Sequence, residues 1–488
     1  YIQKFYLYMN LTKPEEFLHI SYSKVSSDGK TLRPAYLVWD LKKLFPKLVV
    51  TEEEALLMTQ RELTPGEGLE FVIRGVRDRY LGVDESWKEL YTWYRQNEGQ
   101  KVDRILDAGF FKKKPDALTG EEAAELYGEK KQFSVTRMER FSACAYAHFL
   151  TYGLHLSDRE RYEFEAMDLG NIAHQSMERF ARKAQEKRMP WPKLEEVQRD
   201  AMIEESVEES IKDYGNTVLY STARNEYMIV RIKQLIRRSV WALTRQMEKG
   251  DFEPSGYEMN FGSGKIDRID TCEDEDMVYV KVTDYKTGMK SFDIVALYHG
   301  LQMQLPVYLN AALELEERRA PGKTVEPAGI FYYRIKDPIV DREKDDHALE
   351  EKILKELRLD GMINAKEEVI EHLEHQLSGT SVLNPIGKNK DGSLNRYSKV
   401  LPPEAFAAML SYTKKKEAQV KRQIYAGEVQ ANPYELNGST GCDYCAYRDI
   451  CGFDPRLDGY AYRSLEKYSK EEVIRRMEEE IENREEPS

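Results

Sequence analysis

Residues 264–286 read GKIDRIDTCEDEDMVYVKVTDYK, and this stretch determines the fold class of the chain. β-Branched and aromatic residues dominate two compact runs within it, 264–270 and 277–286, and a similar run precedes them at 256–261. Runs of this composition are typical of β-strands. Because the three runs follow one another closely, the sequence predicts a three-stranded meander.

Helical patterns surround the meander on both sides. Apolar residues recur at helical spacing over 170–187, 194–250 and 293–318, and a further strand-like run covers 328–335. The sequence therefore predicts an α/β fold in which a small mixed sheet is flanked by helices, with extra helical regions. The length of 488 residues leaves room for about three domains of ordinary size.

Three side chains of the meander form a candidate catalytic site. In a strand, residues i and i+2 lie on the same face, so Asp284 and Lys286 point the same way. The carboxylates of Asp267 and Asp284 suit a divalent cation, Mg²⁺ or Mn²⁺, while Lys286 would orient an attacking water. An Asp-x-Lys pair is also common on exposed strands, where it is only a surface ion pair.

Two helical pairs add to this pattern. His174 and Glu178 stand at i and i+4 in one predicted helix, and Gln304 and Tyr308 have the same spacing in another. His174 alone would be interpreted as an ordinary helix histidine. The order His, Asp, Asp-x-Lys, Gln-x-x-x-Tyr is much rarer than its parts, so the elements are interpreted together as one site.

This order resembles the RecB-type branch of the PD-(D/E)xK nuclease superfamily, which has a restriction-endonuclease-like core. The resemblance implies that a metal ion binds to His174, Asp267 and Asp284, and we expect the main-chain carbonyl of Tyr285 to be a further ligand. It also implies which residues act on the substrate. The expected catalytic residues are Asp267, Asp284, Lys286, Gln304 and Tyr308, the last two on the DNA side.

Four of the five cysteines form a second pattern. Cys442, Cys445 and Cys451 lie close together near the end of the chain, whereas Cys144 precedes all of the predicted strands. Three thiolates at this spacing need a fourth ligand, and Cys144 is the candidate with similar small and aromatic neighbours. The spacing alone is compatible with zinc or with an iron–sulfur cluster. Cys272 stands apart and is interpreted as a plain thiol.

One cysteine before the nuclease motifs and three after them occur together in a known arrangement. The whole chain resembles the C-terminal part of the AddB-type subunit of ATP-dependent helicase/deoxyribonucleases. The motifs that carry this resemblance are RMERFSACAYAHFLTYG at 137–153, KIDRID at 265–270, YHGLQMQL at 298–305 and CGFDP at 451–455. The resemblance implies a [4Fe–4S] cluster bound by Cys144, Cys442, Cys445 and Cys451.

The resemblance also implies how the chain is divided and what it binds. Residues 1–110 would be the C-terminal end of an inactive helicase-like region, 111–125 a linker, 126–470 the RecB-type nuclease domain with its iron–sulfur staple, and 471–488 an acidic C-terminal helix or tail. The expected partners are DNA, as a single strand emerging from a duplex end, and an AddA-type helicase/nuclease subunit in a heterodimer.

Charge and composition exclude several other roles. The chain has 73 Lys and Arg against 86 Asp and Glu, a net charge of -13, which argues against non-specific cationic binding to nucleic acid or membranes. Positive charge must therefore be concentrated locally, and we expect it near Lys286, Arg268 and Arg334. No Gly-x4-Gly-Lys-Ser/Thr motif occurs, so no ATPase activity is expected. No apolar run suits a membrane span and no signal peptide opens the chain, so a cytoplasmic location is expected.

The sequence thus predicts a Mg²⁺-dependent DNA exonuclease module that hydrolyses phosphodiester bonds. Within a helicase/nuclease complex, this module would process double-strand DNA ends for recombinational repair. The alternative is a non-catalytic DNA-binding scaffold of the same complex. All of the candidate site residues are present in the sequence, which favours the nuclease.

Overall fold

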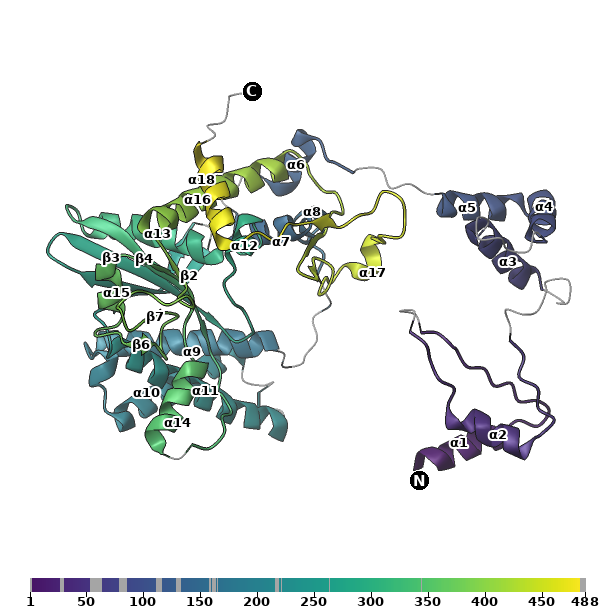
Figure 1. The fold of residues 1–488 in the computed structure, drawn as a ribbon, viewed down its shortest axis with the longest axis horizontal. Coiled ribbons are helices and arrows are strands. Elements are labelled where there is room, and N and C mark those ends of the chain that lie inside the picture. The colour runs from purple at the N-terminus through teal and green to yellow at the C-terminus, as the bar shows by residue number, and fades with distance from the viewer. Residues whose placement is uncertain are drawn as a thin grey trace. The chain divides into compact units, whose positions relative to one another are not determined.

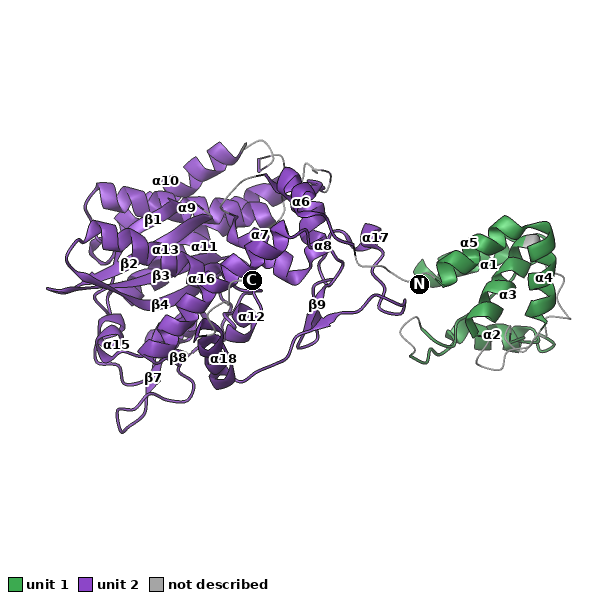
Figure 2. Cartoon of the chain, turned by 90° about the horizontal axis from the view of Figure 1, so that it is seen from above, with its two compact units in different colours: residues 1–111 green, residues 112–488 purple. Residues whose placement is uncertain are grey.

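The structure, a computed structural model, divides into two compact units, residues 1–111 and 112–488 (Figure 2). It describes residues 2–26, 30–52, 64–78, 86–110, 116–128, 133–157, 159, 164, 166–215, 219, 220, 222–262, 264–343 and 345–482. All of the candidate site residues lie in the second unit.

The first unit is helical. Its helices are α1 (Ile2–Thr12), α2 (Tyr36–Leu44), α3 (Pro65–Asp78), α4 (Trp87–Asn97) and α5 (Gly99–Gly109). A small core of Val72, Tyr94 and Val102 forms among α3, α4 and α5.

A six-stranded mixed sheet forms the centre of the second unit (Figure 1). In spatial order its strands are β1 (Glu253–Phe261), β2 (Gly264–Glu273), β3 (Met277–Lys286), β4 (Thr324–Arg334), β5 (Asp360–Asn364) and β8 (Val400–Leu401). The first three pair antiparallel, β3 pairs parallel with β4, β4 antiparallel with β5, and β5 parallel with β8. The predicted meander and the predicted α/β fold with a mixed sheet are confirmed.

Helices and short strands surround this sheet, and Figure 1 shows helices on both of its faces. The helices are α6 (Gly120–Tyr127), α7 (Val135–Ala143), α8 (Ala145–His148), α9 (Ala166–Glu186), α10 (Glu196–Gly215), α11 (Ala223–Met247), α12 (Ile294–Tyr298), α13 (Gln304–Arg319), α14 (Asp346–Glu356), α15 (Glu367–Leu373), α16 (Pro403–Tyr425), α17 (Arg448–Cys451) and α18 (Lys470–Glu482). A π-helical turn covers Phe149–Gly153 and a 3-10 turn covers Trp191–Lys193. The short strands are β6 (Gly379–Thr380), β7 (Gly387–Lys388), β9 (Tyr434–Leu436), β10 (Ser439–Thr440) and β11 (Arg463–Ser464). Within the described part of the chain, no helix combines the length and the apolar character needed to cross a bilayer.

The central strand β3 contributes to two cores, one on each face of the sheet. Helices α9, α10 and α11 share the first core with Tyr279 and Tyr285. Helices α7, α13, α16 and α18 share the second core with Val280 and Val282. Because side chains of a strand alternate between its faces, Asp284 continues the row that faces α13.

The segment predicted as a linker is shorter than expected. Helix α6 begins inside 111–125, where Thr119 and Glu122 form a capping box at its N-terminus. Ala123 and Tyr127 are buried in the core that also contains residues of α16. The residues from the cap onward therefore fold with the second unit, because this helix buries an apolar side.

The C-terminal helix is packed against the unit and is not a fully solvated tail. Val473, Ile474 and Met477 of α18 are buried and share a core with α16. Their spacing of three and four residues places them on one helix face, which explains how an acidic segment packs. The helix is observed as far as Glu482, and residues 483–488 lie outside the described part of the chain.

Candidate metal centre

The end of the ladder between β2 and β3 brings two carboxylates together. The two strands pair in register as far as Arg268 and Thr283. Beyond this point Asp267 Oδ2 accepts a 2.7 Å hydrogen bond from the backbone N–H of Tyr285. Asp284 follows on β3 and is only 2% exposed. Its charge interacts with that of Asp267, so the two carboxylates share one site.

Polar side chains hold Asp284 from two sides. Gln304 Nε2, in the first turn of α13, donates a 2.8 Å hydrogen bond to Asp284 Oδ1 and a 3.0 Å hydrogen bond to Tyr308 Oη. Lys286 forms an ion pair with Asp284 Oδ2, as expected for residues i and i+2 on one strand face. That oxygen accepts no hydrogen bond from the described residues. The structure thus brings together the predicted residues Asp267, Asp284, Lys286, Gln304 and Tyr308.

Burial and like charge control the protonation of Asp284. Loss of solvent, reinforced by the negative charge of Asp267, raises the pKa of Asp284 to about 7, and the positive charge of Lys286 opposes this rise. Two adjacent carboxylates repel each other when both are ionised. A divalent cation between them would remove that repulsion and use the unsatisfied oxygen, so the residues present fit a hard cation.

His174 approaches the same carboxylates from α9. Its Nδ1 lies 3.3 Å from Asp267 Oδ2. Burial acts to lower the pKa of His174, but the hydrogen bond and the charge of Asp267 outweigh it, so the net shift is upward. The predicted histidine ligand therefore lies beside the predicted aspartate ligand. The carbonyl of Tyr285 stays a prediction.

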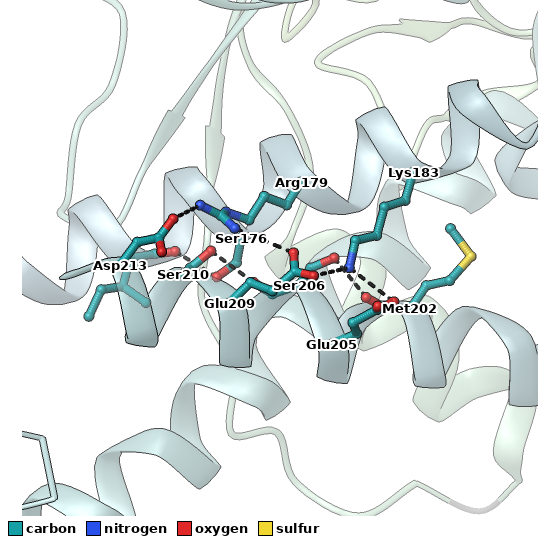
Figure 3. A network of polar contacts seen from close by, with 10 residues as sticks. Ser176, Arg179, Lys183, Met202, Glu205, Ser206, Glu209, Ser210 and Asp213 are labelled. Carbon is teal, nitrogen blue, oxygen red and sulfur yellow. Dashed lines mark hydrogen bonds and ion pairs between the residues drawn. The ribbon is translucent and has the colours of Figure 1, made fainter. Parts of the chain in front are cut away.

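Helix α9, which carries His174, is fixed against α10 by a polar network (Figure 3). The ion pairs join Arg179 to Glu209 and Asp213, and Lys183 to Glu205 and Glu209. Ser206 and Ser210 are fully buried, and their hydroxyls donate to carbonyls one turn earlier in α10. Exposed ion pairs are each worth about 0–1 kcal/mol. Several of them along two helices nevertheless select one register, and with it the position of His174.

Glu258 of β1 is a site residue that the sequence analysis missed. Ligand atoms of Glu258, His174 and Asp267 all lie within 4.8 Å of one another. Glu258 has a φ of 49°, a left-handed conformation that costs a non-glycine residue about 1–3 kcal/mol. Burial raises the pKa of Glu258, and its 2.6 Å ion pair with Lys265 opposes this. Because such strain clusters at functional sites, Glu258 is a further candidate ligand.

Glu139 of α7 was also missed, although it lies inside a motif quoted above. Its Oε1 accepts hydrogen bonds from the backbone N–H groups of Met303 at 2.7 Å and Gln304 at 3.0 Å. N–H groups at the start of a helix have no partner within that helix. Burial raises the pKa of Glu139, while the nearby charge of Lys290 opposes the rise. Glu139 thus caps α13 and positions Gln304, which holds Asp284.

Arg268 does not supply the expected positive surface charge. It is 2% exposed, its Nε lies 2.6 Å from Asp270 Oδ1, and its guanidinium lies over the Trp191 ring. The expectation for Arg268 is therefore wrong, because its side chain enters the core on the face covered by α9. Lys286 and Arg334 are direct partners in the register of β3 and β4.

Four cysteines line a second pocket, away from the metal centre. Cys144 lies between α7 and α8, and the other three lie at and before α17. The cavity of about 20 Å³ is lined by Cys144, Cys442, Cys445 and Cys451 together with Tyr146, Ala147, Ala431, Pro433, Gly441, Tyr447 and Phe453. Burial raises the pKa of the Cys144 and Cys442 thiols, so a cation is needed to stabilise their thiolates. Cys272, on β2, does not line this pocket.

Close backbone approach joins the two sides of the cysteine pocket. Figure 1 shows the segment with α17 lying beside α8, although they are far apart in the sequence. The N–H of Ala145 donates a 3.0 Å hydrogen bond to Asn432 Oδ1. A Cβ on Gly441 would lie 2.9 Å from the carbonyl oxygen of Ala143. The segment before Cys442 therefore reaches the end of α7 only because residue 441 is glycine.

Comparisons with known proteins agree with this geometry. The model of the PD-(D/E)XK nuclease superfamily matches residues 132–452. The chain is 37% identical over 493 residues to the B-type subunit of the ATP-dependent helicase/deoxyribonuclease from Lachnoclostridium phytofermentans, and 32% identical over 511 residues to the protein of the same name from Alkaliphilus oremlandii. These alignments cover 97% and 99% of this chain but 43% and 44% of the two relatives, so the chain spans less than half of their length.

Proposed function

The chain belongs to the PD-(D/E)XK nuclease superfamily, and we propose that it is the Mg²⁺-dependent DNA exonuclease module of a helicase/nuclease complex. The observation that carries the proposal is the convergence of Asp267, Asp284 and Lys286, with Asp284 Oδ2 lacking a hydrogen bond from the described residues. Paired carboxylates suit a divalent cation, and an adjacent ammonium suits an attacking water. The names of the relatives combine a helicase with a deoxyribonuclease, which supports DNA as the substrate.

We assign the metal ligands to His174, Asp267, Asp284 and the main-chain carbonyl of Tyr285, with Glu258 as an additional ligand. The oxygen-rich donor set favours Mg²⁺ or Mn²⁺. When bound, the ion stabilises the negative charge that develops on the scissile phosphate. The hydrogen bond from the Tyr285 N–H fixes one oxygen of Asp267, which leaves the other oxygen of that carboxylate for the ion.

The protein side chains orient the reaction. Lys286 holds the attacking water in line with the phosphate, and its positive charge offsets the charge that grows there. The ion pair with Asp284 fixes the position of the Lys286 ammonium. Gln304 fixes Asp284 in turn, and together with Tyr308 it lines the side on which DNA binds.

We propose that Cys144, Cys442, Cys445 and Cys451 bind a [4Fe–4S] cluster rather than zinc. A zinc ion in direct contact with four sulfur atoms leaves no hollow between them. The pocket instead encloses about 20 Å³, which exceeds the roughly 10–15 Å³ that one water requires. When present, the cluster acts as a structural tie between α7 and the C-terminal segment, and it takes no part in hydrolysis.

The size of the relatives supports a multi-subunit setting. This chain covers less than half of proteins named for a helicase and a nuclease, so the remaining activities belong to other segments or subunits. We propose an AddA-type helicase/nuclease subunit as the partner, a single strand from a duplex end as the substrate, and recombinational double-strand break repair in the cytoplasm as the process. Residues 1–110 are proposed to end a helicase-like region without ATPase activity, and residues 126–470 to form the nuclease domain.

The direct test is degradation of end-labelled linear DNA by the purified chain, alone and with its partner subunit. Nucleotide release that requires Mg²⁺ or Mn²⁺ and stops on addition of EDTA is the expected result. Covalently closed circular DNA is the matched control, since an exonuclease needs an end. DNA binding without cleavage in both metals and in the presence of the partner would support the scaffold alternative and reject the nuclease.

Within this function, Glu139→Ala should lower kcat by about tenfold while the affinity for DNA stays nearly unchanged. A hydrogen bond to a charged group contributes about 1.5–3 kcal/mol, and its loss loosens the first turn of α13 where Gln304 lies. Glu139→Gln keeps one acceptor and should restore most of the turnover. Steady-state kinetics of the two variants separate kcat from KM, with Glu121→Gln on the exposed first turn of α6 as the control. An unchanged kcat in Glu139→Ala would show that the cap is only structural.

A further inference from the structure

A third group of potential metal ligands lies at the other end of the ladder between β2 and β3. Ligand atoms of Asp251, Cys272 and His372 lie within 4.8 Å of one another. Asp251 precedes β1, Cys272 lies near the end of β2, and His372 lies in the last turn of α15. Cys272 is five residues beyond Asp267 on the same strand, about 17 Å at 3.3 Å per residue. The group is therefore separate from the metal centre.

Carboxylates flank the His372 ring on both sides. His372 Nδ1 lies 2.8 Å from Asp251 Oδ2, and its Nε2 lies 3.3 Å from Asp274 Oδ2. His375 Nε2 lies 2.9 Å from the other oxygen of Asp251. Two imidazoles and a buried thiol thus gather around one carboxylate, with a second carboxylate behind the ring. This environment favours positive charge, and a metal ion bound to a ring nitrogen supplies it.

Backbone contacts fix this geometry independently of any ion. The N–H of Asp251 donates to the carbonyl of His372 at 2.9 Å, and the N–H of His375 donates to the carbonyl of Lys249 at 2.8 Å. A Cβ on Gly250 would lie 2.3 Å from the His372 carbonyl oxygen, so this close approach requires glycine. The two segments are therefore held together by main-chain atoms, and the ligands need only side-chain rotation to coordinate an ion.

We propose that Asp251, Cys272, His372 and His375 bind Zn²⁺. The donor set of one sulfur, two imidazole nitrogens and one carboxylate oxygen matches the preferences of zinc, whereas Mg²⁺ prefers oxygen ligands alone. His372 also lies at the C-terminal end of α15, where the helix dipole favours a cation. Such an ion would tie α15 to the start of β1 and the end of β2, and the site does not depend on the nuclease proposal.

The test is the metal content of the full chain purified after growth with added zinc. Elemental analysis should find about one zinc per chain more in the parent than in Cys272→Ser, His372→Ala or Asp251→Asn, with the metal of the four-cysteine pocket unchanged. His347→Ala is the matched control, because His347 is 80% exposed on α14. It should retain the zinc content of the parent.

Cobalt titration provides a second readout that reports the thiolate directly. Addition of Co²⁺ to the parent should produce a sulfur-to-cobalt charge-transfer absorption that is weaker in Cys272→Ser by the contribution of one thiolate, and His347→Ala should match the parent. Should His372→Ala fail to fold, Asp251→Asn still decides the outcome, because Asp251 is exposed and asparagine has the same shape. Equal zinc content and equal cobalt spectra in the parent, Cys272→Ser and Asp251→Asn would overturn the proposal.

Discussion

Asp284→Asn should abolish metal-dependent DNA cleavage, with a decrease in rate of about 10³-fold or more, because charge stabilisation by a bound ion is worth several kcal/mol. Asparagine preserves the shape of the side chain and keeps Oδ1 as an acceptor for Gln304, so the fold should persist. The charge that attracts the ion and fixes Lys286 is lost. The measurement is the initial rate of nucleotide release from linear DNA at one Mg²⁺ concentration.

The same variant should lose the stabilisation that metal gives to the parent. In the parent, Mn²⁺ should raise Tm more at pH 8 than at pH 6, because below its pKa of about 7 Asp284 binds a proton that competes with the ion. The sign follows from linkage. A carboxyl pKa raised in the folded state makes the metal-free protein less stable as pH rises from about 4 towards 7, and the ion offsets this loss.

Asp341→Asn is the matched control for this substitution, since the side chain of Asp341 is fully exposed. It should cut DNA and respond to Mn²⁺ like the parent. Cleavage by Asp284→Asn at the rate of the parent would show that the metal centre is wrongly assigned. Loss of cleavage with an unchanged Mn²⁺ shift would instead place the ion elsewhere.

Cys144→Ser should lower Tm by about 10 °C or more, because it removes several kcal/mol of ligand binding that is also folding free energy. The parent should contain about four iron and four sulfide per chain after anaerobic purification. The loss at residue 144 breaks the one long-range tie to residues 442–451, whereas the other three cysteines are neighbours in the chain. DNA binding should also weaken, since α7 carries both this tie and the Glu139 cap of α13.

Cys272→Ser is the matched control, because Cys272 is buried like Cys144 but does not line the four-cysteine pocket. It should keep the iron content and the DNA affinity of the parent. Zinc in the pocket without iron or visible absorption would reject the iron–sulfur cluster. Iron in Cys144→Ser at the level of the parent, with an unchanged Tm, would reject Cys144 as a ligand.

Much of the fold is determined by patterns that lie within single segments of the sequence. The alternation of side chains along 277–286 identifies β3 and places Asp284 and Lys286 on one face, and the spacing of four residues does the same for Gln304 and Tyr308 on α13. These predictions succeed because strand and helix periodicities are local properties of the backbone.

Contacts between distant segments are what only the tertiary structure decided. Arg268 carries the same charge as Lys286 yet is buried, because its neighbours on β2 and α9 determine which side of the sheet is core. Glu139 and Glu258 join the site because α7 meets the start of α13 and because β1 lies beside Asp267. No period in the sequence relates such residues, since the helix-end N–H groups and the ligand geometry are satisfied through space. The sequence therefore determines which groups are available, and packing selects the ones that meet.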